Sequence, residues 1–440
     1  MFVYNLRLAW LSTRQNLTLT GLMIGAIALG IGVCMSMLTV YLIMAGNPIP
    51  AKGDELFSVR VDNWDPDSDH PYDDAFPDEP PWQHTYRDAT ALLESPVPLR
   101  QVAMFKSLLT VQPDNADIQP YRELVRMTTR DFFAMFDVPF VYGGTWDAAA
   151  DEAGSEVVVL SQESNDKLFG GEDSVGRKLK LEDRVFTVVG VIDGWNPIPK
   201  FYDVNNNPFE DAETFYAPFS MIATWDMPRS GNTNCWKPEE IVSHEDFLGS
   251  ECIWIQFWAE LPTAAMQQDY DQWLNGYVRE QQALGRLQRP MDNRVDDVMA
   301  WLEANRVVRN DSKVLVGLAF MFLMVCVFNT VGLLLARFVG KAPVVGLRRA
   351  LGASKLAVFR QHLIEVGLIG FAGGLLGLVL TAGGLAAIKW LYEAPDRMVA
   401  LDWRMVGITM AVAIGASVVA GLYPTWQVCR MNPARYLKTQ

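Results

Sequence analysis

The sequence predicts an integral membrane protein with four transmembrane α-helices and a large α+β extracytoplasmic domain on helical stalks. Hydropathy and charge are segregated along the chain. Half of its 440 residues are hydrophobic although the net charge is −14. Residues 1–46 carry +2 and residues 313–440 carry +9, whereas residues 47–312 carry −25. An acidic block between basic, apolar ends argues against a uniformly globular enzyme and against a nucleic-acid binder, whose surface would be basic.

Four long uncharged segments predict the transmembrane helices. Residues 15–51, 314–336, 366–388 and 405–429 carry no charged side chain. About 20 apolar residues cross a bilayer, and a charge inside the hydrocarbon is costly. Core helices of a soluble protein, the alternative, are usually shorter and amphipathic. The first segment exceeds the hydrophobic region of a signal peptide, so we expect it to stay as an anchor.

The basic residues predict the orientation. The loop 338–360 carries several Lys and Arg and no acid, which by the positive-inside bias places this loop and both termini in the cytoplasm. The predicted organisation is an amphipathic helix over 1–16, spans over 17–46, 313–337, 361–389 and 404–429, an extracytoplasmic domain with stalk over 47–312, a coupling loop over 338–360, a short periplasmic loop over 390–403 and a cytoplasmic tail over 430–440.

The amphipathic helix before the first span is predicted from Phe2, Leu6 and Trp10. These residues recur near helical spacing beside Arg7 and Arg14. Apolar and basic side chains in this arrangement are typical of a helix that lies on the membrane surface.

The centre of the acidic block is expected to form a mixed α+β domain, in two subdomains. Val-rich and alternating patterns predict strands, and two stretches look helical. The expected strands are 156–160, 177–181 and 185–192, and the expected helical stretches are 127–136 and 165–169.

From 264 to 310 the pattern is helical and leads into the second span. Val295, Val298, Leu302 and Val307 form an apolar stripe. A continuous helix here would be a stalk between the domain and the membrane, and a plain connecting helix is the alternative.

Two of the five cysteines are candidates for a disulfide. Cys235 and Cys252 are the only ones on the predicted oxidising side. A bond between them would stabilise their loop by about 3 kcal/mol, and two separate buried thiols are the alternative. Cys34, Cys326 and Cys429 lie in or beside spans and are expected to act as small apolar residues.

We predict no catalytic residue, no metal site and no cofactor in this chain. Three aspartates within 65–69 imitate the start of an EF-hand loop, but His70 and Phe76 stand where that loop needs Gly and Glu. Residues 171–178 suggest a phosphate loop but lack its Gly-Lys-Ser/Thr ending. Energy for any work must therefore come from elsewhere.

The order of segments resembles the MacB/FtsX-type ABC transporter permeases, the four-span mechanotransmission class. Four stretches carry the resemblance: 156–195 and 132–144 for the periplasmic core, 345–353 (VGLRRALGA) with Gln361 and Glu365 for the cytoplasmic loop and third span, and 421–424 with 432–437 for the C-terminal signature.

The resemblance implies a permease subunit of an ABC-type efflux or export complex in the bacterial inner membrane. Its cytoplasmic loop would dock on a separate ABC ATPase that binds ATP and Mg. The implied coupling residues are Val345, Gly346, Leu347, Arg348, Arg349, Leu351, Gly352 and Lys355. Arg348, Arg349 and Lys355 could donate to acidic or carbonyl groups of that partner, or they could be topology residues only.

Other functions and one departure from the family stay open. An FtsX-like regulator of a cell-wall hydrolase, a lipoprotein-extracting permease, or a membrane-anchored sensor are the alternatives. The acidic residue common before the family's coupling motif is Val344 here, after Ala342-Pro343. The chain could therefore pair with a specialised ATPase or with a second, non-identical permease.

Small residues in the spans suggest where helices pack closely. Gly21 and Gly25, like Gly370 and Gly374, have GxxxG spacing. We expect the first span at the interface of a homodimer or paralogous heterodimer, and the third span packed internally. A periplasmic adaptor and an outer-membrane channel are the further partners that the resemblance implies.

Overall fold

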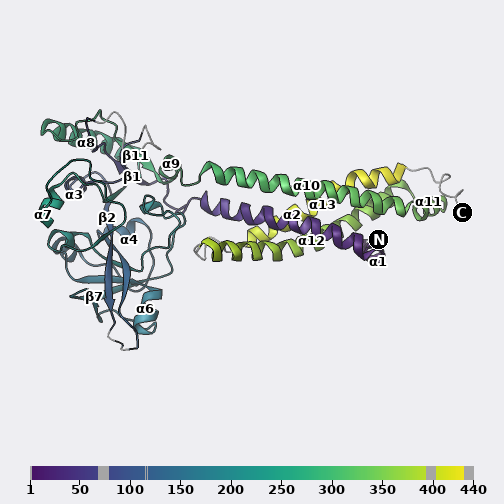
Figure 1. The fold of residues 1–440 in the computed structure, drawn as a ribbon, viewed down its shortest axis with the longest axis horizontal. Coiled ribbons are helices and arrows are strands. Elements are labelled where there is room, and N and C mark those ends of the chain that lie inside the picture. The colour runs from purple at the N-terminus through teal and green to yellow at the C-terminus, as the bar shows by residue number, and fades with distance from the viewer. Residues whose placement is uncertain (1, 68–78, 114, 116, 393–402, 431–440) are drawn as a thin grey trace. The chain divides into compact units, whose positions relative to one another are not determined.

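The computed structural model describes residues 2–67, 79–113, 115, 117–392 and 403–430. The chain divides into a helical unit, Met1–Ala45 with Val308–Gln440, and a sheet unit, Gly46–Val307 (Figure 1). The boundaries fall close to the expected ends of the first span and the start of the second. Each unit is described by itself below.

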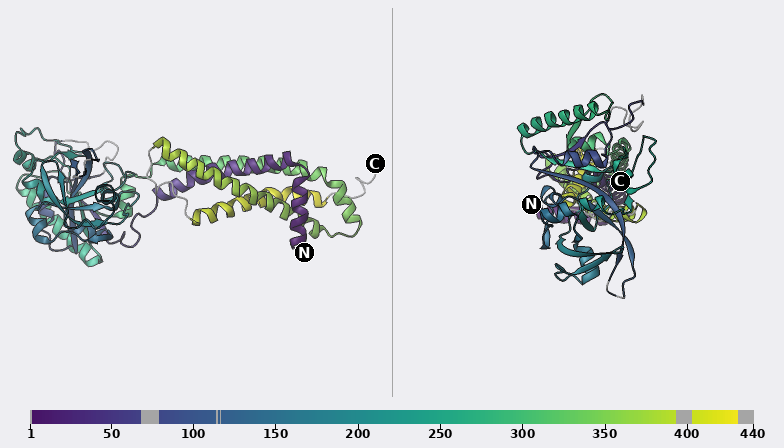
Figure 2. Two further views of the ribbon diagram at one scale, coloured as in Figure 1. Left: turned by 90° about the horizontal axis from the view of Figure 1, so that it is seen from below. Right: turned by 90° about the vertical axis from the view of Figure 1, so that its left-hand side faces the viewer.

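The helical unit contains four helices that are long and apolar enough to cross a membrane. They are α2 (Leu17–Met44), α10 (Asn310–Gly340), α12 (Lys355–Tyr392) and α13 (Trp403–Arg430). Two shorter helices accompany them, α1 (Phe2–Arg14) and α11 (Ala342–Ala350). Figure 2 shows α1 turned steeply away from the direction of α2. The turn falls at Asn16, whose side chain caps α2 by accepting a hydrogen bond from the Leu19 amide.

Glycines let α12 pack closely against its neighbours. A Cβ at Gly370 would lie 2.5 Å from Ser417 Oγ, and a Cβ at Gly374 would lie 2.9 Å from Ala413 Cβ, both on α13. Gly373 and Gly377 approach α2 in the same way. A Cβ at Gly21 or Gly25 would meet no described atom within 4 Å. These four glycines of α12 therefore serve packing within the chain, whereas Gly21 and Gly25 lie on an open part of α2.

The sheet unit is built on one mixed sheet. The strand order is β11-β1-β10-β2-β3-β8-β5-β7-β4, with β6 pairing with both β2 and β7, and β9 with β2. The pairs β3–β8 and β5–β7 are parallel and the others antiparallel. The strands are β1 Leu56–Arg60, β2 Arg100–Gln112, β3 Tyr121–Thr128, β4 Phe140–Gly143, β5 Val157–Ser161, β6 Lys178–Leu181, β7 Arg184–Ile192, β8 Phe215–Pro218, β9 Arg229–Ser230, β10 Gln256–Glu260 and β11 Arg294–Asp297.

One 20-residue helix, α8, and several short helices accompany the sheet. They are α3 Tyr86–Leu92, α4 Asp131–Met135, α5 Ala148–Ala153, α6 Gln162–Phe169, η1 Phe201–Asp203, η2 Phe219–Ala223, α7 His244–Gly249, α8 Ala264–Ala283 and α9 Val298–Ala304. Two hydrophobic cores form because successive residues of a strand point to opposite faces. On β2, Ala103 and Phe105 enter one core while Val102 and Met104 enter the other.

The strands and short helix predicted over 156–192 agree with β5, α6, β6 and β7 to within a few residues. The helical stretch expected over 127–136 is wrong at its start. Met127 and Thr128 belong to β3, where they pair with Phe105 and Met104, and the helix begins only at Asp131. Pairing across the sheet overrides the local pattern. The expected two subdomains are replaced by the single sheet of the described strands.

The helical pattern over 264–310 is interrupted. α8 ends at Ala283, and Gly285 follows with a φ of +85°, a left-handed conformation that glycine adopts without strain. The chain then forms β11 and α9 before α10 begins at Asn310. Val298, Leu302 and Val307 of the predicted stripe are buried in the domain core. The stripe reflects core packing and not one continuous stalk helix.

Candidate functional site

The candidate site lies around α11, at the end of α10. Lys341 closes α10 and precedes α11, and Pro343 stands in the first turn, where its missing N–H costs nothing. Gly352 ends the segment with a φ of +103°. These residues explain why the chain forms a short separate helix here and does not extend α10.

The exposed face of α11 is apolar. Val345 and Gly346 are buried against the bundle. Val344, Leu347 and Leu351 expose 56 %, 52 % and 80 % of their surface and follow one another at spacings of three and four. This spacing places Val344, Leu347 and the C-cap residue Leu351, which directly follows α11, on one side of the helix. We call these three residues the apolar face of α11.

The two arginines of α11 contact the chain's own helices. Arg348 Nη1 donates to Gln361 Oε1 of α12 at 2.8 Å, and Arg349 Nη1 donates to the Cys429 carbonyl of α13 at 3.2 Å. The resemblance implies that both arginines contact a partner protein. In the structure they are half-buried and tie α11 to two long helices, whereas Leu347, Leu351, Gly352 and Lys355 are exposed.

A buried ionic network lies beside α11. Glu365 Oε1 accepts from Arg337 Nη2 at 2.6 Å, from Lys341 Nζ at 2.9 Å and from Ser12 Oγ at 2.7 Å. Lys341 also donates to Ser12, and Arg337 Nη1 donates to Thr20 Oγ1 at 2.9 Å. The network joins α1, α2, α10 and α12. The sequence predicts only a topological role for Arg337 and Lys341 and no role for Ser12. Glu365, an acid that follows several basic residues at the start of an uncharged segment, is the sequence signal for an ion pair here.

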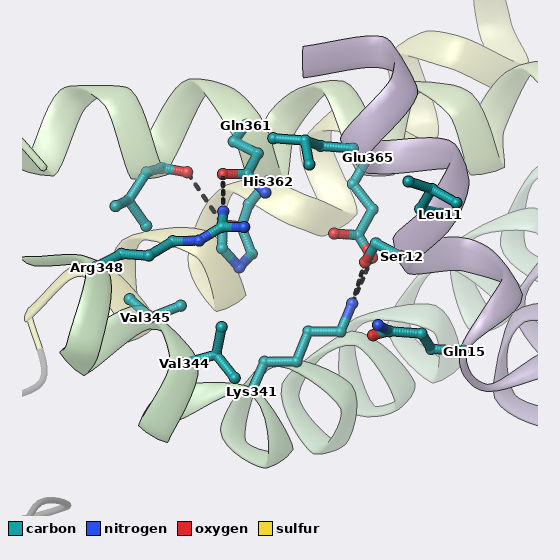
Figure 3. A pocket seen from close by; sticks show the side chains of 12 residues that line it. Leu11, Ser12, Gln15, Lys341, Val344, Val345, Arg348, Gln361, His362 and Glu365 are labelled. Carbon is teal, nitrogen blue, oxygen red and sulfur yellow. Dashed lines mark hydrogen bonds and ion pairs between the residues drawn. The ribbon is translucent and has the colours of Figure 1, made fainter. Parts of the chain in front are cut away.

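A pocket opens next to this network (Figure 3). Its volume is about 260 Å³ and its walls come from α1, α11, α12 and the α10–α11 junction. The lining residues are Leu8, Leu11, Ser12, Gln15, Lys341, Val344, Val345, Arg348, Val358, Gln361, His362 and Glu365.

The sheet unit contains a second buried ionic cluster. Arg126 Nη2 contacts Asp203 and Glu213 at 2.5 Å each, and Lys200 lies 3.2 Å from Glu213. Burial raises the pKa of Glu213, but Arg126 and Lys200 outweigh it and hold that pKa well below its ordinary value. Charges of both signs are matched here. The cluster therefore joins β3, η1 and the segment before β8 and has a structural role.

The predicted cysteine pair lies in the sheet unit as a disulfide. Cys235 and Cys252 are bonded, and Asn234 forms a β-bridge with Ile253 beside them. Cys34, Cys326 and Cys429 are free and buried. Of the EF-hand imitation, His70 and Phe76 lie outside the described residues, as do residues 432–437 of the C-terminal signature.

These features define a multi-pass helical membrane protein with a large α+β domain between its first and second spans. Residues 20–243, just over half of the chain, match the MacB-like periplasmic core domain, and residues 316–433 match the FtsX-like permease C-terminal domain. The chain therefore belongs to the family of MacB/FtsX-type ABC transporter permeases.

The curated relatives are distant but align over most of this chain. One is the macrolide export ATP-binding/permease protein MacB of Syntrophobacter fumaroxidans, 22 % identical over 70 % of this chain and 46 % of the relative. Another is the pyoverdine export ATP-binding/permease protein PvdT of Pseudomonas savastanoi, 23 % identical over 70 % of this chain and 42 % of the relative. The chain spans about half the length of these relatives.

A solved structure aligns with part of this chain at low similarity. It is the periplasmic region of MacB from Actinobacillus actinomycetemcomitans, 13 % identical, covering 57 % of this chain and 92 % of that one. The TM-score is 0.36, too low to establish a common fold by itself.

Proposed function

We propose that this chain is the permease component of an ABC-type export complex. In this proposal an ABC ATPase, which binds ATP and Mg, drives the motion, and the sheet unit acts on the exported substrate in the periplasm. The two family domains and the export names of the relatives support it. Within the described residues no group of three or more His, Cys, Asp or Glu side chains could hold a metal ion.

The observation that carries the proposal is the apolar face of α11. Exposed apolar side chains on a short helix at the end of the bundle favour a protein partner, because their burial lowers the free energy of the complex. We infer that this partner is the ATPase. The acid that the family commonly places at position 344 is replaced by Val344, so docking relies on apolar contact.

The contacts of α11 suggest how force would pass into the bundle. Arg348 joins α11 to α12 and Arg349 joins it to α13. Through Lys341 and Glu365 the same segment is connected to α12 and α1. A displacement of α11 by the ATPase would therefore move several long helices together. α2 and α10 continue directly into the sheet unit along the chain, so they are the covalent route for that motion.

The remaining parts of the assembly are proposals of the same kind. The basic loop suggests that α11 and both termini face the cytoplasm and that the protein lies in the bacterial inner membrane. The open face of α2 at Gly21 and Gly25 suits a second permease copy, as a homodimer or a paralogous heterodimer. A periplasmic adaptor and an outer-membrane channel would complete an export path.

The test is a pull-down in which the full chain is the bait and the purified ABC ATPases of the same organism are offered as partners. The double variant Leu347→Glu with Leu351→Glu should lower the affinity about tenfold or more, since truncating or charging a central apolar anchor typically costs at least 2 kcal/mol. Val242→Glu is the matched control, because Val242 in the sheet unit is as exposed as Leu351, at 80 %. Equal binding by the double variant and the control, or robust ATP turnover by this polypeptide alone, would refute the proposal.

A further inference from the structure

We propose that the pocket between α1, α11 and α12 binds the headgroup of an anionic, hydroxyl-bearing phospholipid of the phosphatidylglycerol type. The ligand that this pocket would recognise combines a phosphate diester, which carries one negative charge, with a separate hydroxyl group that can donate a hydrogen bond. This inference goes beyond the proposed export function and requires only that this end of the bundle lies at the membrane surface.

Two cationic side chains face the pocket from different walls. Figure 3 shows Arg348 of α11 and Lys341 of the α10–α11 junction on two sides of the hollow. In the described part of the chain Arg348 donates to Gln361 through Nη1, so Nη2 and Nε can donate to a bound group. Lys341 uses two of its three ammonium hydrogens on Ser12 and Glu365. Both cations can therefore donate to phosphate oxygens without breaking these bonds.

His362 supplies a buried polar atom that lacks a partner. Its side chain lines the pocket, and only 4 % of the residue is exposed. Nδ1 lies 3.0 Å from the Val358 carbonyl and donates to it, so in the neutral ring Nε2 is an acceptor. Nε2 has no hydrogen-bond partner among the described residues, and Figure 3 shows it turned toward the hollow.

A buried acceptor without a partner is costly, and a ligand hydroxyl would satisfy it. The Phe338 ring packs edge-on against the imidazole with centroids 4.6 Å apart, which holds the ring in place. The ligand that fits this arrangement has a phosphate for the two cations and a hydroxyl for His362. A phosphoglycerol headgroup has both groups a few bonds apart.

The charge balance favours an anion over a zwitterion. Among the residues that the structure describes, Lys341, Arg348 and the adjacent Arg337 face one carboxylate, that of Glu365. A phosphoglycerol group adds one negative charge to this excess of positive charge. A phosphoethanolamine group would bring its own ammonium among three cations, which is unfavourable in a partly desolvated site.

The apolar wall and the size of the pocket favour a lipid over a soluble phosphate. Leu8, Leu11, Val344 and Val345 line it beside the polar groups. A volume of about 260 Å³ lies below the roughly 300–1,000 Å³ of pockets for drug-sized ligands, so it admits a headgroup and not two acyl chains. The chains would stay in the bilayer, next to the exposed Trp10 and Leu11 of α1.

The test is native mass spectrometry of the full chain in detergent, titrated with phosphatidylglycerol or phosphatidylethanolamine. The native chain should retain phosphatidylglycerol with about tenfold preference, and Arg348→Gln should lose about tenfold of that affinity, as expected for one hydrogen bond to a charged group. His362→Phe preserves a ring against Phe338 and should lower the preference for the hydroxylated lipid. Lys355→Gln is the control, an exposed lysine of the same region that does not line the pocket.

Equal retention of both lipids by the native chain, or equal losses in Arg348→Gln and Lys355→Gln, would overturn the proposal. In a separate competition experiment, soluble glycerol phosphate or inorganic phosphate is added to the lipid-bound chain. Displacement of the lipid at millimolar concentration would overturn the lipid assignment. If Arg348→Gln lowers only ATPase association, the pocket belongs to the ATPase interface and the lipid proposal fails. The lipid titration contains no ATPase, so its failure leaves the export proposal standing.

Discussion

The carboxylate of Glu365 lies 2.6 Å from Nη2 of Arg337, and each side chain exposes only 2 % of its surface. Lys341 and Ser12 complete the shell around the same carboxylate oxygen. Two cations share one anion at the end of the bundle where α1, α10 and α12 meet. A buried ion pair of this kind is compatible with a stable fold only when all of its partners are present. A buried charge without a counter-charge is strongly destabilising.

Removing the shared carboxylate should destabilise the bundle. Glu365→Gln leaves Arg337 and Lys341 without a counter-charge and should lower the free energy of unfolding by about 3–5 kcal/mol. Thermal unfolding of the full chain in detergent measures the change. Glu303→Gln, an exposed acid at the end of α9, is the control and should stay within about 0.5 kcal/mol of the native chain. A Glu365→Gln variant as stable as this control would show that the network contributes nothing.

Breaking the buried ionic cluster of the sheet unit should lower the free energy of unfolding more than breaking a surface ion pair. Arg126→Met leaves Asp203 and Glu213 buried beside Lys200 with one cation fewer, and should cost about 3–5 kcal/mol. Arg177→Met breaks the exposed pair with Glu172 and should cost at most about 1 kcal/mol. Denaturant unfolding followed by tryptophan fluorescence suits both variants, since ten of the fourteen tryptophans lie in residues 47–312. Similar costs for the two variants would contradict the assignment.

Acidification should destabilise the sheet unit through His84. Burial lowers the pKa of this fully buried imidazole, and the opposing effects of the Val59 carbonyl and Asp88 do not restore it. Below the unfolded value of about 6.5 the unfolded chain binds a proton that the folded chain does not, so the free energy of unfolding falls as the pH falls. The slope should approach about 1.4 kcal/mol per pH unit until the folded pKa is reached.

Substitution of this histidine by a residue that does not titrate tests the effect. His84→Gln should be less stable than the native chain at pH 8, because the hydrogen bond from Nε2 to the Val59 carbonyl is disturbed. Between pH 6.5 and 5 its stability should change less than that of the native chain. Equal slopes for the two proteins would show that another group causes the acid sensitivity.

The two GxxxG pairs should respond in opposite ways to a larger side chain. Gly370→Leu would collide with Ser417 and Ala413 and should destabilise the chain by about 1–3 kcal/mol or more. A Cβ at Gly21 would meet no described atom within 4 Å, so we expect the Gly21→Leu monomer to unfold as the native chain does. If α2 forms the dimer interface, Gly21→Leu should also lower the dimer fraction in native mass spectrometry. An unchanged dimer fraction would remove α2 from that interface.

The order of spans and strands in this protein is predictable from its sequence because the strongest signals are local. Uncharged apolar segments longer than 20 residues predict transmembrane helices with few alternative interpretations. The β-branched run 185–192 predicts a strand equally clearly. The errors lie where tertiary pairing decides. Met127 and Thr128 are strand residues because β2 pairs with them. The end of α8 is a different case, since Gly285 is a local helix-stop signal that the helical prediction over 264–310 passed over.

The sequence predicts where the candidate site lies along the chain but not which residues contact each other there. The motif 345–353 located α11, yet the same letters predict neither that Arg348 and Arg349 contact α12 and α13 nor that Leu347 and Leu351 face outward. Ser12 and Glu365 are 353 positions apart. A hydrogen bond over that separation depends on how the bundle packs, which no local pattern encodes.

The native chain should react little with thiol reagents because none of its five cysteines is an exposed free thiol. Cys235 and Cys252 are bonded to each other, and Cys34, Cys326 and Cys429 are buried in the helices. A maleimide probe would therefore report almost exclusively on a cysteine introduced at an exposed position. Single replacements at Lys355 and at Val242, labelled with a membrane-impermeant reagent in intact cells, would read the sidedness of each unit without first removing any native cysteine.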